Sequence, residues 1–201
     1  MKMMITKTNS KLEKTSKINK AKIYQFNLPA YKTKAGKTVC PFAKDCVKFC
    51  YAQKGTFRFS NVQKKYESNY KITKQSNFIK LIQDDLNKAK PPHLRIHSSG
   101  DFYSPKYLKK WLKIASNNPN IIFYGYTKSI PLFKELNSIP DNFIFCYSEG
   151  GKMDHLIDTE KDFHARIFNS KKELENAGYV DTSENDLWIT QNNNKIGLIY
   201  H

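Results

Sequence analysis

From Pro92 onward the chain repeats a short apolar or aromatic run followed by a helical segment, and this rhythm constrains the fold most. The runs are His93–His97, Ile121–Tyr126 and Asn142–Tyr147. Consecutive parallel strands need a long crossover, usually a helix, so the alternation predicts a parallel sheet. We therefore expect an α/β fold, either a partial (β/α) barrel or an open parallel sheet.

Helix start and stop signals separate these runs. Ser104 supplies an N-cap and Pro105 a first-turn proline to a helix, and Ser129 with Pro131 opens a shorter one. Upstream, residues 77–88 place four apolar side chains on one helical stripe before a Pro-Pro stop. These segments are expected to form the helices that cover the sheet.

Other segments complete the expected order. Residues 22–27 alternate and predict a first strand, and residues 161–177 predict a helix after the third run. Residues 187–191 and 196–200 flank too few residues for a crossover helix. We expect this tail to end the sheet as an antiparallel hairpin.

The cations are concentrated in the first half of the chain. Residues 1–100 hold 22 Lys and Arg against 5 Asp and Glu, whereas residues 101–201 hold 12 against 13. A basic field attracts nucleic acid, because neutralising phosphates releases counterions. The alternative is an A/T-rich genome that encodes Lys at solvated positions, since only 3 of the 34 cations are Arg.

Length and composition suggest how the chain is divided. Its 201 residues fit one domain, and we assign that domain to residues 21–201. Residues 1–20 carry six Lys and one Glu, which predicts a mobile basic arm. No run approaches the ~18 apolar residues of a membrane span. We expect a soluble cytoplasmic protein with no membrane partner.

Three of the four cysteines lie within eleven residues, at Cys40, Cys46 and Cys50. Three clustered thiols in a reducing compartment fit metal ligation better than disulfides. Three thiolates leave one position open, either on zinc or on one iron of a four-iron cluster. The main alternative to the cluster is a zinc ion with a fourth protein ligand. The other alternative is that the cysteines are buried and bind no metal. The candidate fourth ligands are His97, His155, His164 and Cys146.

Each predicted strand ends in a polar turn. The turns are His97–Phe102, Thr127–Ser129 and Ser148–Gly151. In parallel α/β folds ligands bind at the carboxyl ends of the strands. We expect the three turns to converge on one site, with Asp101, Lys128 and Glu149 as the candidate catalytic side chains.

These motifs together resemble known families. The cysteine triad, the strand ending in Ser-Gly-Asp and the helix after it resemble the start of a radical S-adenosylmethionine domain. The strings CPFAKDCVKFCYA, RIHSSGDFYSPKYLKKW and FYGYTKS resemble more closely a phage-encoded three-cysteine family of the gene product 88 type. The resemblance implies a sheet of the radical S-adenosylmethionine type.

The resemblance also implies roles for individual residues. Cys40, Cys46 and Cys50 would bind three irons of a [4Fe–4S] cluster, whose fourth iron would take S-adenosylmethionine. Cofactor contacts fall on Tyr51, Ser99, Gly100, Asp101, Tyr126 and Ser148. Such an enzyme breaks the sulfonium bond reductively and therefore needs an electron donor as partner.

Three hypotheses follow from the sequence, and they leave open whether the chain is an enzyme. The first is a radical-type iron–sulfur enzyme, with a nucleic acid or nucleotide among its candidate substrates. The second is a zinc-stabilised nucleic-acid-binding module with Zn²⁺ in the cysteine loop, residues 40–50. The third is a phage host-interaction protein of the host cytoplasm, which keeps the enzyme-like scaffold and the cluster but has lost turnover.

Overall fold

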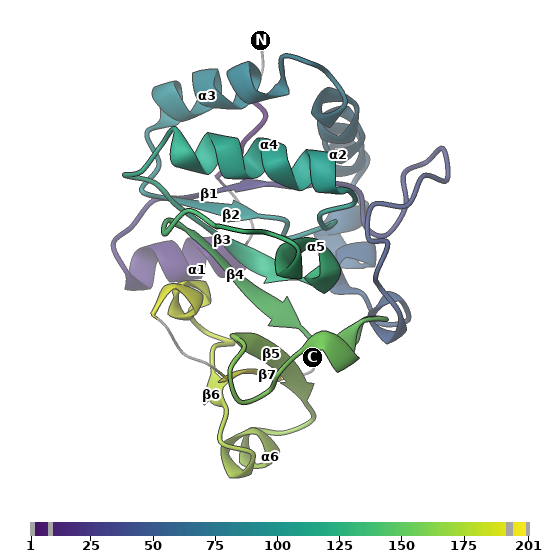
Figure 1. Cartoon of the computed structure of the whole chain (residues 1–201), viewed down its shortest axis with the longest axis vertical. Helices are drawn as coiled ribbons and strands as arrows, with labels where there is room; N and C mark the ends of the chain where they lie inside the picture. Colours follow the sequence, from purple (N-terminus) through teal and green to yellow (C-terminus); the bar gives the residue numbers. More distant parts are fainter. Residues whose placement is uncertain (1–2, 8–9, 192–194, 200–201) are drawn as a thin grey trace.

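The computed structural model describes residues 3–7, 10–191 and 195–199. In this part of the chain seven parallel strands form one open sheet with the order β1-β2-β3-β4-β5-β7-β6 (Figure 1). The strands are β1 (Ile23–Phe26), β2 (His93–Ile96), β3 (Ile122–Thr127), β4 (Phe143–Ser148), β5 (His164–Phe168), β6 (Val180–Asp181) and β7 (Lys195–Ile199). The expected α/β class and parallel sheet are confirmed, in the open form.

Helices connect these strands. The α-helices are α1 (Ser10–Ile18), α2 (Ser60–Thr73), α3 (Phe78–Ala89), α4 (Pro105–Ser116), α5 (Ile130–Lys134) and α6 (Lys171–Asn176). Short 3-10 helices are η1 (Asp45–Val47), η2 (Tyr51–Gln53), η3 (Gly55–Arg58), η4 (Asp154–Leu156) and η5 (Asp186–Thr190). The expected strands β1 to β4 and helices α3, α4 and α5 are confirmed within one or two residues.

Local sequence explains where the two long covering helices start and stop. The Ser104 side chain accepts a hydrogen bond from the amide of Tyr107 at 3.3 Å and caps α4, with Pro105 at its first position. Helix α3 ends at Lys90, whose φ of 45° is left-handed, and two prolines follow. Both helices place an apolar stripe against the sheet.

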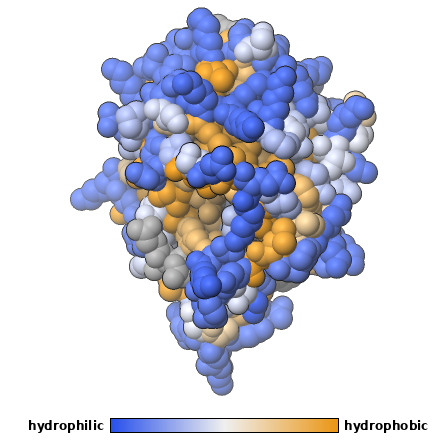
Figure 2. Space-filling view, viewed as in Figure 1, coloured by the Kyte–Doolittle hydropathy of each residue, from blue (hydrophilic) through white to orange (hydrophobic). Residues whose placement is uncertain are grey.

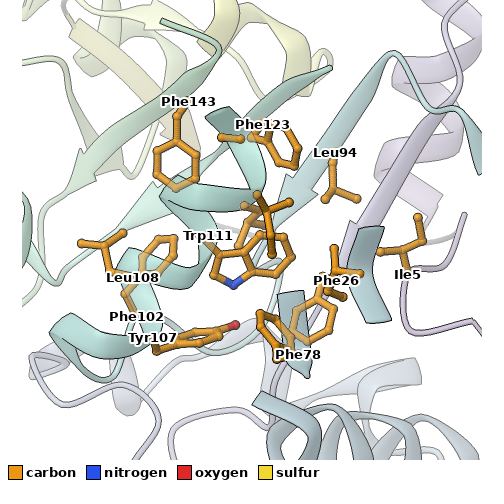
Figure 3. Close-up of a cluster of buried hydrophobic side chains, with 14 of the residues drawn as sticks. Ile5, Phe26, Phe78, Leu94, Phe102, Tyr107, Leu108, Trp111, Phe123 and Phe143 are labelled. Carbon is orange, nitrogen blue, oxygen red and sulfur yellow. The ribbon is translucent and has the colours of Figure 1, made fainter. Parts of the chain in front are cut away.

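The main core lies between the sheet and helices α3 and α4 (Figure 1). The rings of Phe26 and Trp111 meet edge to face with centroids 5.2 Å apart, and Phe78 packs on both. Figure 3 shows Trp111 in the middle of this cluster, among side chains from β1, β2, β3 and both helices. Such aromatic pairs add about 0.5–1.5 kcal/mol beyond their buried area.

The opposite face of the sheet carries a smaller core. Leu12 of α1 and Leu187 of η5 pack with Tyr124 and Cys146, which project from β3 and β4. All four side chains are buried. This face is therefore covered by two short elements, and the carboxyl ends of the strands stay accessible from it.

The predicted C-terminal hairpin is wrong. Residues 186–190 form η5 and β7 runs parallel to both β5 and β6. Leu187 and Ile189 alternate as in a strand, but they pack on the second core from a 3-10 helix. Two apolar residues are too few to distinguish these geometries from sequence. Residues 192–194 of the predicted turn lie outside the described residues.

Two further expectations differ from the structure. The segment predicted as one helix over residues 161–177 contains β5 and the short α6, because β5 pairs with β4 and β7. The described residues of the segment expected as a mobile arm include α1, with Leu12 buried, and Met4 and Ile5 in the main core. Tertiary pairing and burial decided both segments.

The surface is hydrophilic over most of the face seen in Figure 2, with apolar residues gathered around a hollow in its middle. Within the described residues, no helix combines the length and the apolar character that crossing a bilayer requires.

Candidate functional site

The cysteine loop is fastened to the ends of two strands. The Asp101 amide donates to the Val39 carbonyl at 3.1 Å, which ties the loop to the turn after β2. The Cys46 amide donates to the Gly150 carbonyl at 3.4 Å, which ties it to the turn after β4. The loop is thereby held across the carboxyl ends of the strands.

A cavity of about 510 Å³ opens beneath this loop. It lies over the carboxyl ends of the strands and reaches the second face of the sheet, where Lys11 and Asp186 line it. Most of the predicted site residues line this cavity: Cys40, Cys46, Cys50, Tyr51, Ser99, Gly100, Asp101, Tyr126, Lys128 and Ser148. The structure brings these residues together, and a volume of this size suits a small organic ligand.

Besides the hydroxyl of the half-buried Tyr126, three polar atoms in fully buried residues of the lining lack an internal hydrogen-bond partner among the described residues: Arg95 Nε, His97 Nδ1 and Ser99 Oγ. The three residues are 6%, 4% and 3% exposed. Buried polar groups are normally paired, and an exception calls for water, an ion or a ligand. Three exceptions in one cavity indicate a site for a polar ligand.

Asp101 organises the site through three hydrogen bonds to its carboxylate. One carboxylate oxygen accepts from the Thr127 hydroxyl and the Phe102 amide, each at 2.7 Å, and the other accepts from the Lys128 amide at 2.8 Å. Burial raises the pKa of this carboxyl, and the three hydrogen bonds partly offset that effect. The structure thus places Asp101 as the link between the turns after β2 and β3.

The turn after β2 contains two left-handed residues. Gly100 has a φ of 86°, and a Cβ there would lie 2.5 Å from the Cβ of Leu28, so only glycine fits. His97 has a φ of 62°, and its Nε2 lies 2.9 Å from the hydroxyl of Tyr107. Burial, together with the nearby Arg95 charge, lowers the pKa of His97 to about 3. This imidazole therefore stays neutral.

Lys128 stands between the cysteine loop and the end of β4. Its ammonium donates to the hydroxyl of Ser148 at 2.8 Å and also to the carbonyls of Ser148 and Glu149. The Lys128 charge acts on the Cys46 thiol, and both side chains border Gly150, where an added Cβ would lie 3.7 Å from Lys128 Nζ and 3.9 Å from Cys46 Cβ. Lys128 is thus a fixed positive charge beside a thiol.

The thiols respond to these surroundings. Burial raises the pKa of Cys40, and the Asp101 charge raises it further. Burial also raises the pKa of Cys46, which the Lys128 charge partly offsets. Cys40 and Cys46 are each coupled electrostatically to Cys50, so the three thiols share one environment. Metal binding requires thiolates, and a metal cation would have to supply the stabilisation that burial removes.

Glu149 is one predicted site residue that the structure does not place in the cavity. Its carboxylate accepts from Arg166 Nε of β5 at 2.7 Å, and its other oxygen lies 3.9 Å from Nε2 of the buried His164. Glu149 therefore links β4 to β5. Alternation explains the outcome, since a one-residue step along an extended chain turns the side chain to the other face.

Tyr51 and Tyr126 enclose the cavity from two sides. The Tyr51 hydroxyl donates to the Ser98 carbonyl, which fixes the ring against the turn after β2. The Tyr126 ring lies over the Arg95 guanidinium, 4.6 Å from the centroid. Both residues were predicted to contact a cofactor, and both line the cavity.

The buried ion pair of Arg95 and Asp186 was not expected from the sequence. The Arg95 guanidinium donates to Asp186, and Lys11 Nζ lies 3.2 Å from the same carboxylate. Burial raises the pKa of Asp186, but the Arg95 and Lys11 charges outweigh it and hold the pKa below its usual value. An arginine inside a strand of otherwise apolar and aromatic neighbours was the available signal.

The other residues considered as a fourth metal ligand lie elsewhere. Cys146 is buried in the second core, and neither His155 nor His164 lines the cavity. Among the described residues, no three His, Cys, Asp or Glu side chains are grouped closely enough to hold one metal ion. His97 faces the cavity with an unpartnered nitrogen, so it alone of these candidates shares the site of the three cysteines.

Comparison with known proteins identifies relatives of this chain. The model of a family described as Gene product 88 matches residues 3–200. The "Gene 88 protein" of Mycobacterium phage L5 is 31% identical over 105 residues, which cover 44% of this chain and 42% of that protein. The "Gene 88 protein" of Mycobacterium phage D29 is 30% identical over the same length. The matched region therefore spans less than half of these relatives. No solved structure matches the chain.

Proposed function

The chain belongs to the gene product 88 family, which has members encoded by mycobacteriophages, and we propose that it is an iron–sulfur protein that binds S-adenosylmethionine. The observation that carries the proposal is the shared cavity, in which three thiols face three buried polar atoms without partners. Neither the cluster nor the cofactor is part of the family description.

The donor set fits a four-iron cluster. Thiolates are the ligands that iron–sulfur clusters use, and each cysteine binds a different iron. A single zinc ion instead needs its ligands to converge at about 2.3 Å on one point. Cys40, Cys46 and Cys50 would hold the cluster, and the Lys128 ammonium would offset part of its negative charge.

The rest of the cavity suits the cofactor. S-adenosylmethionine carries an amino group, a carboxylate and ribose hydroxyls, which need the kinds of partners that Ser99 Oγ, His97 Nδ1 and Arg95 Nε offer. When bound, a cluster reduced by an electron donor would supply the electron for reductive cleavage of the cofactor's sulfonium carbon–sulfur bond. The chain itself would bind the ligand through these polar atoms, with Tyr51 and Tyr126 beside it, and burial keeps His97 uncharged.

Metal analysis tests the first half of the proposal. The protein is purified anaerobically, and iron, sulfide and zinc are quantified in the wild type, in a Cys40→Ala/Cys46→Ala/Cys50→Ala variant and in Cys146→Ala. We expect about four irons and four sulfides per chain in the wild type and in Cys146→Ala, and none in the triple variant. About one zinc and no iron per chain would contradict the cluster and indicate a structural zinc site instead.

Equilibrium dialysis tests the second half. Radiolabelled S-adenosylmethionine is dialysed against the wild type, Ser99→Ala and the surface control Ser68→Ala. Loss of one hydrogen bond at Ser99 weakens binding about two- to tenfold, whereas Ser68→Ala binds like the wild type. If iron-loaded wild type does not bind S-adenosylmethionine, the proposed cofactor is wrong, and the proposed cluster is unaffected.

A further inference from the structure

The segment from Lys44 to Phe59, called here the rim, exposes three large aromatic side chains. Phe49, Tyr51 and Phe59 are 41%, 60% and 58% exposed. Among the described residues, the other aromatic side chain exposed to a comparable degree is Trp188, at 37%. Large exposed rings concentrated within eleven residues mark a surface that contacts another molecule.

The rim is also basic. Lys44, Lys48, Lys54 and Arg58 are exposed, and Asp45 is the single acidic residue of the segment. Asp45 lies 3.6 Å from Lys48, but both side chains are more than half exposed, so this ion pair is weak. The rim therefore presents a positive field around its rings.

The rim borders the cavity, and its geometry is fixed. Phe49 and Tyr51 line the cavity as well as facing solvent. The Tyr51 ring is held at its hydroxyl by the Ser98 carbonyl and at its edge by Phe57, with ring centroids 5.6 Å apart. A ring that is anchored yet mostly exposed offers a preorganised stacking face.

We propose that the rim binds single-stranded nucleic acid. Unstacked bases stack on exposed aromatic rings, and phosphates are neutralised by interleaved cations, which is how sequence-tolerant single-strand binding sites work. A duplex keeps its bases stacked and cannot use the rings. The proposal rests on the exposure of these rings and on the charge around them.

Fluorescence anisotropy tests the rim on the protein as purified, with its metal content measured in the same sample. The probes are fluorescein-labelled DNA and RNA single strands of about 12 nucleotides and the matching DNA duplex. We expect the single strands to bind more tightly than the duplex. With up to four cations on phosphates, raising salt from about 50 to about 200 mM weakens binding by up to about fifty-fold.

Two matched pairs of variants localise the binding. Phe59→Ala removes one stacking face and weakens single-strand binding by about 5- to 150-fold, while Trp188→Ala does not. Lys48→Gln/Lys54→Gln weakens it more than Lys106→Gln/Lys109→Gln, which removes the same charge from the exposed side of α4. Circular dichroism and thermal melting confirm that each variant is folded.

Defined results would overturn the inference. Equal losses in both lysine pairs would assign the binding to overall charge. Unchanged binding in Phe59→Ala would exclude stacking on the rim. Absence of nucleic-acid binding, with concentration-dependent self-association in light scattering, would make the rim a contact between copies of this chain. Anisotropy and iron content are separate measurements, so loss of the cluster proposal would not be confused with loss of this one.

Discussion

The Asp101 carboxylate and the Thr127 hydroxyl lie 2.7 Å apart and join the turn after β2 to the end of β3. The same carboxylate accepts the amide of the next residue, Lys128, at 2.8 Å. One buried side chain thus fixes two neighbouring walls of the cavity. A substitution that breaks these hydrogen bonds is expected to disturb both walls.

Asp101→Asn tests this link. The amide can accept from Thr127 with its oxygen, but its NH₂ then faces the Lys128 amide, so two donors meet. We expect the free energy of unfolding to fall by about 1–3 kcal/mol, the cost of an unsatisfied buried group. Urea unfolding measures it, with the exposed Asp141→Asn as control. A variant as stable as the wild type would show that water replaces the bond.

Gly100→Ala tests the close approach of the turn to Leu28. The left-handed backbone costs about 1–2 kcal/mol, and the contact with Leu28 adds about 1–3 kcal/mol of overpacking. Gly36→Ala is the matched control, because Gly36 also has a left-handed φ of 76°, but a Cβ added there would have no atom within 4 Å. The midpoint temperature of thermal denaturation should therefore be clearly lower for Gly100→Ala than for Gly36→Ala. Equal losses of stability in the two variants would mean that Leu28 can move away from the added Cβ at no cost.

The Arg95 and Asp186 pair predicts a specific dependence of stability on pH. The folded-state pKa of Asp186 is lowered, so its contribution is present above the unfolded pKa and is lost as the pH falls through the folded value. At neutral pH Asp186→Asn should lower the free energy of unfolding by about 3–5 kcal/mol, because it leaves Arg95 buried without its anion.

Urea unfolding at several pH values measures this effect. The difference in stability between wild type and Asp186→Asn should begin to narrow below about pH 4, where the carboxylate of the unfolded chain takes up its proton, and should keep narrowing as the pH falls through the lower folded-state pKa. The exposed Asp141→Asn variant should stay close to the wild type throughout. A gap that does not change with pH would show that the pair contributes through packing rather than charge.

His97 provides a spectroscopic prediction. Its pKa of about 3 lies well below that of an unfolded histidine, so the ring stays neutral as the pH falls from 8 toward 5. The Nδ1 and Nε2 chemical shifts of His97 should be constant over that range in folded protein. In urea-unfolded protein they should titrate near pH 6.5. A folded-state midpoint near 6.5 would mean that water reaches the ring.

The sequence also predicted much of the site. Polar turns after successive strands placed the Ser-Gly-Asp turn and Lys128 at one edge of the sheet, and both line the cavity. Glu149 is the exception, because its amide still pairs with the Ala165 carbonyl of β5, so alternation turns its side chain away from the cavity and toward Arg166. The distance from a strand end predicts a neighbourhood, but the direction of each side chain depends on its partners.

Local pattern determined the strand and helix alternation, the α4 cap at Ser104 and the thiol cluster, because each is written in residues close together in the chain. Tertiary structure decided the segments whose local signals were short or ambiguous. Residues 186–190 form a 3-10 helix that buries Leu187 and Ile189 in the second core. Strand β5 forms because it pairs with β4 on one side and β7 on the other. The Arg95 and Asp186 pair joins residues 91 positions apart, and only the folded chain brings those charges together in one cavity.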